Sequence, residues 1–129
     1  MLNLPAIVTC LALVLYALLS LRVARARVKY NILAPATTGH PAFERCFRIQ
    51  QNTGEQLIIL LPGLWLFAVL VSPNWAGLLG AIWILGRVIY AVSYTREPQS
   101  RALGFAVGFI ANAVLVLGSL AVAIWQSLH

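Results

Sequence analysis

The charged residues of this 129-residue chain gather in two short windows, and this distribution limits its possible folds more than any other feature. The nine basic and three acidic residues all fall within 22–55 and 87–101. Three uncharged segments remain, 1–21, 56–86 and 102–129. Only 9% of the residues are charged and 61% are hydrophobic, whereas about 25% are charged in an ordinary globular domain. This composition predicts an integral membrane protein.

The uncharged segments supply four membrane-spanning helices, each of which needs about 20 mostly apolar residues. Asn3–Leu21 is the first and Ala102–Leu128 is the last. The segment 56–86 supplies two, because Ser72–Trp75 contains the proline and asparagine of a tight turn. The predicted fold is all-α: a single domain over residues 1–129, folded as an antiparallel four-helix transmembrane bundle.

Both polar loops of this bundle fall at the same end. They are Asn31–Phe43 and Thr95–Ser100, and the basic segment Arg22–Lys29 precedes the first. Because cytoplasmic loops are enriched in lysine and arginine, this end is predicted to be cytoplasmic, with both termini on the other side. We therefore interpret the net charge of +6 as a signal for orientation and lipid-headgroup contact, and not as a nucleic-acid-binding surface.

The two middle helices are too short to cross the membrane on apolar residues alone. At 1.5 Å per residue, Leu57–Val71 and Trp75–Gly86 span about 22 Å and about 18 Å, whereas the hydrocarbon core is about 30 Å thick. They must draw in polar neighbours, which in membrane proteins face the bundle interior or a polar cavity. These neighbours are Asn52 and Glu55 on one helix and Arg87 and Tyr90 on the other.

Helical spacing places such residues on common faces. At about 100° per residue, one polar stripe forms on the second helix and another on the third, and Arg101 begins the fourth helix at the same depth. The pattern predicts one cavity at the cytoplasmic end with two or three arginines, a carboxylate, an amide and two phenols. The stripes consist of Glu44, Arg48, Gln51, Asn52 and Glu55, and of Arg87, Tyr90 and Tyr94.

Each of these residues also has a purely structural interpretation. Arg48 and Glu55 can form an ion pair across helices, and the tyrosines can belong to an aromatic belt at the membrane interface. Arg87 can extend its long side chain to the interface, and Arg101 can contact lipid phosphate. Spacing alone leaves these alternatives open.

Other residues are typical of helix packing and not of a catalytic or binding site. Gly104 and Gly108 form a GxxxG pattern typical of close helix contacts, and Asn112 is expected to bond a neighbouring helix. The cysteines and histidines are isolated from one another, so neither a disulfide nor a metal site is predicted. They are Cys10, Cys46, His40 and His129.

Two strings in the chain resemble the signature of the MAPEG superfamily, the membrane-associated proteins in eicosanoid and glutathione metabolism. Thr37–Glu55 (TTGHPAFERCFRIQQNTGE) matches an F-E-R-x-x-R-x-x-x-N-x-x-E pattern, and Gly86–Arg101 contains R-x-x-Y-x-x-x-Y followed by an arginine. The resemblance covers nearly the whole chain, and the short loops are similar to those of bacterial members. It implies a homotrimer in a bacterial inner membrane, with glutathione between neighbouring subunits at the cytoplasmic end.

The resemblance also implies roles for individual residues. Arg101 is the expected catalytic residue, because it would activate the glutathione thiol. Gln56 stands where the leukotriene synthases of the family have a tyrosine, which favours a general glutathione transferase or peroxidase. The expected glutathione-binding residues are Arg48, Asn52, Glu55, Tyr90 and Tyr94, with help from Gln50 and Arg27.

These residue types suit glutathione, which has two carboxylates, one ammonium group and a thiol. Arginine binds carboxylates through paired hydrogen bonds, and Glu55 complements the ammonium group. The Arg101 guanidinium keeps its charge when partly desolvated and favours the thiolate, which is the nucleophilic form. No metal is expected to take part.

The predicted function is therefore a membrane-bound glutathione transferase that acts on hydrophobic electrophiles from the bilayer, with glutathione-dependent reduction of lipid hydroperoxides as a side activity. One alternative is a non-catalytic lipid-binding member of the same superfamily. Another is a small four-helix multidrug exporter. An exporter is expected to place a carboxylate inside its first span, and residues 1–21 contain none.

Overall fold

The chain folds into long helices joined by short connections. The computed structural model describes residues 1–129, the side chain of Pro98 excepted. Each α-helix in this described chain is long and apolar enough to cross a membrane, so the predicted all-α membrane protein with four spans is confirmed. The elements are α1 (Asn3–Tyr30), α2 (Pro41–Leu70), α3 (Pro73–Arg96), the short 3-10 helix η1 (Pro98–Arg101) and α4 (Ala102–Leu128).

The local sequence accounts for the ends of the helices. α2 and α3 each begin with a proline, whose fixed φ suits the first helical position. The residue before each proline caps the helix: His40 Nδ1 and Ser72 Oγ accept backbone N–H bonds of 3.1 Å and 3.3 Å. Asn31 ends α1 in the left-handed conformation, with a φ of 55°. The chain thus turns inside the segment 56–86 as predicted, but it does so at residues 71–72, because Pro73 already begins α3.

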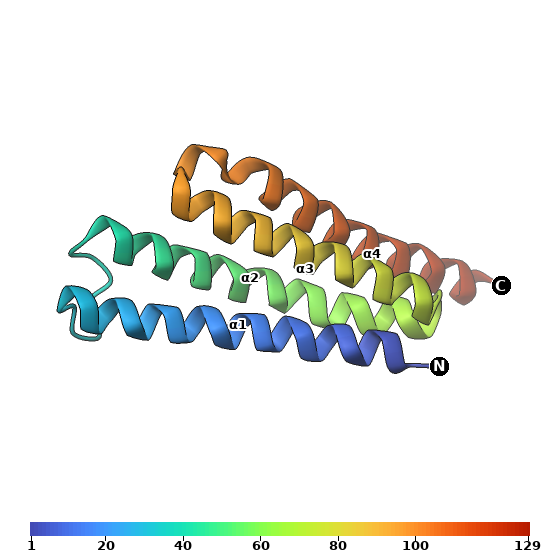
Figure 1. Cartoon of the computed structure of the whole chain (residues 1–129). Coiled ribbons are helices and arrows are strands. Elements are labelled where there is room, and N and C mark those ends of the chain that lie inside the picture. The colour runs from blue at the N-terminus through green and yellow to red at the C-terminus, as the bar shows by residue number, and fades with distance from the viewer.

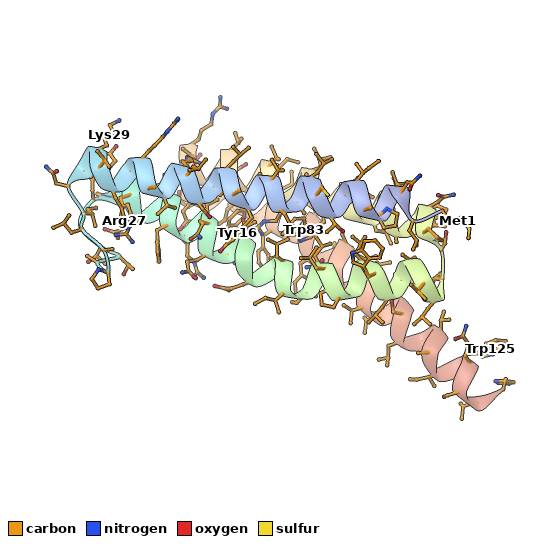
Figure 2. The ribbon with its side chains drawn as sticks, turned by 90° about the horizontal axis from the view of Figure 1, so that it is seen from below. Met1, Tyr16, Arg27, Lys29, Trp83 and Trp125 are labelled. Carbon is orange, nitrogen blue, oxygen red and sulfur yellow. The ribbon has the colours of Figure 1, made fainter. Side chains whose placement is uncertain are left out.

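α2 and α3 form the centre of the bundle. α1 packs against both of them, and so does α4. Consecutive helices run in opposite directions, so that both termini lie at one end and the connections 31–40 and 97–101 at the other (Figure 1). At the connection end, the α1–α2 hairpin projects beyond the α3–α4 hairpin (Figure 1). At the opposite end α4 diverges, and Trp125 stands apart from the other helices (Figure 2).

Apolar side chains fill the middle of the bundle, and glycines bring α3 and α4 together. Leu60, Leu64 and Trp83 are fully buried there. A Cβ added to Gly104 would clash with the backbone of α3, since even the carbonyl oxygen of Gly86 would lie only 2.7 Å away. The close contact expected from the GxxxG pattern is therefore confirmed at this position of α4.

We expect the end with the two charged connections to be cytoplasmic, because the basic residues crowd there. A reporter fused after His129 should then report the opposite side of the membrane, and one inserted within residues 33–38 should report the cytoplasm. Paired reporters that are active on opposite sides of the membrane measure this directly. A cytoplasmic signal from the C-terminal fusion would overturn the predicted topology.

Candidate functional site

A groove opens at the connection end of the bundle, between α2, α3, η1 and α4. Its volume is about 630 Å³, within the usual range of roughly 300–1,000 Å³ for small-molecule sites. Five of the eight residues predicted for the site line it. The lining consists of Arg48, Asn52, Tyr90, Tyr94 and Arg101, together with Gln99, Ala102 and Phe105.

Two tyrosines one helical turn apart form the α3 wall of this groove. The rings of Tyr90 and Tyr94 are 5.6 Å apart between centroids. Beyond them, the Arg101 guanidinium carbon lies 5.4 Å from the centroid of the Tyr94 ring. On the inner side, the Arg87 guanidinium carbon lies 4.1 Å from the Tyr90 ring. Guanidinium groups therefore flank the pair of phenols on both sides, in favourable cation–π contacts.

Arg87 itself lies inside the bundle, beneath the groove. Its side chain is 0% exposed, and it does not belong to the groove lining, although the third-helix stripe placed it there with the tyrosines. Its Nη2 donates a 3.0 Å hydrogen bond to Thr53 Oγ1 of α2. The Thr53 hydroxyl in turn donates a 2.8 Å hydrogen bond to the carbonyl of Ile49. Arg87 thus holds α3 against α2 from within and backs the Tyr90 ring.

Asn52 offers the groove an acceptor without a partner. Its side chain is 8% exposed, and among the described residues its Oδ1 accepts no hydrogen bond. Buried polar atoms are nearly always satisfied in folded proteins. An amide oxygen left unsatisfied in the wall of a polar groove is therefore suited to a donor on a bound molecule.

The charged pair on α2 lies on an outward face. Arg48 Nη1 and Glu55 Oε1 are 3.8 Å apart, and the two side chains are 56% and 57% exposed. The pair runs along one helix, and not across two helices as the structural alternative supposed. Glu55 lines a second groove, of about 490 Å³, between α1 and α2, together with Tyr16 and Gln51.

Gln50 and Arg27 face away from the first groove. Gln50 Nε2 donates to Tyr16 Oη at 3.1 Å and to Ser20 Oγ at 3.4 Å, both on α1. Arg27 Nη1 donates to the carbonyl of Ala36 at 2.7 Å, in the connection between α1 and α2. Figure 2 shows Tyr16 at the middle of the bundle and Arg27 beside this connection. Within one chain, the predicted site residues therefore divide into separate groups.

Three lining residues were missed from the sequence, namely Gln99, Ala102 and Phe105. Phe105 follows Arg101 by one turn, so the helical period gives a signal that could have found it. Gln99 lies in η1, where no such period applies.

A polar layer lies deeper in the bundle. Asn112 Nδ2 of α4 donates to Gln56 Oε1 at 2.9 Å and to the Gln56 carbonyl at 3.2 Å. The interhelical bond predicted for Asn112 is thus confirmed. Gln56 is 8% exposed and ties α2 to α4. In the described part of the chain, no three His, Cys, Asp or Glu side chains gather in a group that could hold a metal ion.

Comparison with known proteins gives consistent similarities. The family model described as "MAPEG family" matches residues 5–121. An uncharacterized protein of the cyanobacterium Synechocystis sp. is 49% identical over 122 residues, which cover 95% of this chain and 89% of that protein. Human microsomal glutathione S-transferase 2 is 38% identical over 105 residues, with 81% and 71% covered. Leukotriene C4 synthase of Cavia porcellus is 39% identical over 96 residues, with 74% and 64% covered.

Proposed function

This chain belongs to the MAPEG family, and on that premise we propose that it is a membrane-bound glutathione transferase acting on hydrophobic electrophiles. The observation that carries the proposal is the groove at the connection end of the bundle. It combines two arginines, two phenols and a buried amide in a volume suited to a tripeptide. The relatives named as glutathione S-transferase and leukotriene C4 synthase support the same chemistry.

The groove has donors and acceptors that complement glutathione. Arg48 would bind a carboxylate of the tripeptide through its planar fork of N–H groups. Asn52 would use its unsatisfied Oδ1 to accept from a peptide N–H. Glu55 lines the neighbouring groove between α1 and α2 and pairs with Arg48 at the boundary of the two grooves, and it would take the ammonium group from there. Tyr90 and Tyr94 supply hydroxyl groups along the α3 wall.

Arg101 would act on the thiol. A guanidinium beside a thiol favours the thiolate, and the start of α4 adds the positive end of a helix dipole. The thiolate sulfur donates its electron pair to an electrophilic carbon of the second substrate, so that a carbon–sulfur bond forms. In a substitution the leaving group departs with its bonding electrons, and in an addition the product takes a proton from water.

The second substrate would arrive from the lipid side. Phe105 lies at the groove margin and stacks on Phe109 one turn deeper, with ring centroids 5.9 Å apart. Both rings are on the exposed face of α4. This apolar track leads from the bilayer to the polar groove, so a lipophilic molecule can meet the thiolate without crossing water.

We further propose that the working unit is a homotrimer. Glu55 and Arg48 are more than half exposed, and charged side chains within a membrane normally face a protein interior or an aqueous cavity. The same face of α2 continues deeper as exposed Ile58, Leu66 and Val69. Another copy of the chain would cover this face, and would be the source of the Gln50 and Arg27 contributions that one chain does not bring to its own groove.

Glutathione titration of the protein in detergent tests the function. We expect the ultraviolet absorbance of a thiolate to rise and saturate at neutral pH, whereas S-methylglutathione gives no such signal. Arg48→Ala should weaken binding about ten- to a hundredfold, since a hydrogen bond to a charged group contributes about 1.5–3 kcal/mol. Asn52→Ala should weaken it about two- to tenfold, since a hydrogen bond between neutral groups contributes about 0.5–1.5 kcal/mol.

The matched control is Arg45→Ala. It removes an equal charge from α2 three residues earlier, outside the groove lining, and should leave glutathione affinity unchanged. A folded protein that binds no glutathione at millimolar concentration would exclude the transferase and favour a lipid-binding role. Turnover with a lipid hydroperoxide and not with electrophiles would replace the transferase by a peroxidase.

A further inference from the structure

A strongly basic hollow lies on another side of the bundle from the groove proposed above for glutathione, which is called the glutathione groove below. It has a volume of about 300 Å³ and lies between the end of α1, the start of α2 and the end of α3. An adjoining hollow of about 340 Å³ shares Arg22 and Thr95 with it and adds Arg96. No aspartate or glutamate is among the described residues that line either hollow. The cations of the first are Arg22, Arg25, Lys29 and Arg45.

Thr95 holds two of these arginines in place. Arg22 Nη2 of α1 donates to Thr95 Oγ1 at 2.6 Å, and Arg45 Nη1 of α2 reaches the Thr95 carbonyl at 3.5 Å. The Thr95 hydroxyl in turn donates to the carbonyl of Ala91 at 2.7 Å. Two helices, α1 and α2, therefore bring guanidinium groups to one threonine of α3. This concentrates positive charge in a hollow whose described lining residues include no carboxylate. Such an arrangement complements an anion with several acceptor oxygens.

The depth and the neighbours of the hollow indicate what kind of anion. The segment from Arg22 to the end of α1 is about 12 Å long at 1.5 Å per residue. It forms the charged end of a transmembrane helix, where contact with lipid headgroups is expected. The apolar side chain of Val92 also lines the adjoining hollow. Deeper along the same helices, Leu18 and Val88 are exposed apolar residues one turn from Arg22 and Val92. The basic hollow is thus directly next to an exposed apolar surface.

We propose that this hollow binds an anionic phospholipid, with the lipid phosphate on the guanidinium groups anchored at Thr95 and an acyl chain along α1 and α3. Arginine recognises phosphate through its planar fork of donors, and anionic lipids attract basic residues at a membrane surface. The bound lipid would join α1, α2 and α3 at the connection end. This site is independent of the glutathione groove and shares no lining residue with it.

The test is competition between phosphatidylglycerol and phosphatidylcholine for the delipidated protein, measured by native mass spectrometry and by thermal unfolding. The wild type should retain phosphatidylglycerol preferentially and unfold at a higher temperature with it. Arg22→Gln/Arg45→Gln should lose about thirtyfold in this preference, which corresponds to about 1 kcal/mol for each of two charges. If that variant does not fold, Arg25→Gln/Lys29→Gln tests the same charge loss with two exposed residues that make no contact with Thr95.

The charge-matched control is Arg48→Gln/Arg101→Gln, which removes two charges at the same end of the bundle but outside the hollow. It should keep the preference for phosphatidylglycerol. Equal retention of the two lipids by the wild type would overturn the proposal, and so would an equal loss in the control, because attraction would then be unspecific. Inorganic phosphate that fully reproduces the stabilisation would also overturn it, since the site would then take a free anion.

Discussion

Gly104→Ala is expected to force α3 and α4 apart, with a loss of both stability and glutathione binding. The added Cβ would overlap the backbone of Tyr90, whose Cα would lie 2.7 Å away, and the carbonyl oxygen of Gly86, also at 2.7 Å. Backbone atoms cannot rotate out of the way as side chains do, so the helices must separate. Overpacking of this kind costs about 1–3 kcal/mol. Because Tyr90 lines the groove, the displacement reaches the site, and we expect glutathione affinity to fall at least about tenfold.

Gly108→Ala is the matched control within the same GxxxG pattern. Its Cβ would lie 3.6 Å from the nearest atoms, on the side chains of Arg87 and Trp83, which is ordinary van der Waals contact. Thermal unfolding in detergent and glutathione titration should therefore leave this variant close to the wild type. Equal effects of the two substitutions would show that the backbone contact at Gly104 is not the cause of the loss. An unaffected Gly104→Ala would show that α3 and α4 do not meet there.

Arg101→Ala is expected to slow conjugation at neutral pH while glutathione still binds. An ordinary thiol has a pKa of about 8.5, so only a few per cent is ionised at pH 7. A cation within about 4–6 Å lowers the pKa by about 1–3 units. Without the guanidinium, the pKa of the bound thiol rises towards its ordinary value, and the rate at pH 7 should fall about ten- to thirtyfold. The deficit should shrink as the pH rises through about 8.5, because both proteins then hold the thiolate.

A pH–rate profile with two further variants separates charge from shape. Arg101→Lys keeps a cation and should recover part of the rate at pH 7. Gln99→Ala alters the same groove without a change in charge and should leave the position of the profile unmoved. If Arg101→Ala shows the wild-type profile and the wild-type thiolate absorbance, Arg101 has no part in thiol activation, and Arg48 becomes the cation to test.

The grouping of the groove residues was readable from the sequence because helices are regular. Arg48 and Asn52 are one turn apart, as are Tyr90 and Tyr94, so each pair shares a face wherever its helix lies. The two windows of charged residues predicted which ends of the helices lie together. Arg101 then had to lie at the same end as the two pairs.

The other side-chain contacts could not be predicted, because they depend on how each helix is oriented about its axis relative to its neighbours. Arg87 shares the helical face of Tyr90, yet its side chain passes behind the ring to Thr53 and not into the groove. Spacing along α3 gives no information on which side of that face α2 packs. Gln50 likewise finds its partners on α1, at Tyr16 and Ser20, and only the docked helices reveal that choice. Gly104 and Gly108 look equivalent in sequence, but only one of them touches backbone.

The bond between Arg87 and Thr53 also bears on how the chain enters the membrane during synthesis. The outer helices have a mean hydropathy of 2.4 and 2.3 in their most apolar windows, whereas α2 and α3 reach only 1.6 and 1.7. An arginine within a lone membrane-spanning helix raises the free energy of insertion, by up to about 2.5–3.5 kcal/mol at the helix centre. α2 leaves the ribosome first and carries Thr53, and only a tight turn separates it from α3. The two middle helices are thus suited to partition into lipid together as a hairpin, while α1 and α4 are apolar enough to be inserted one at a time.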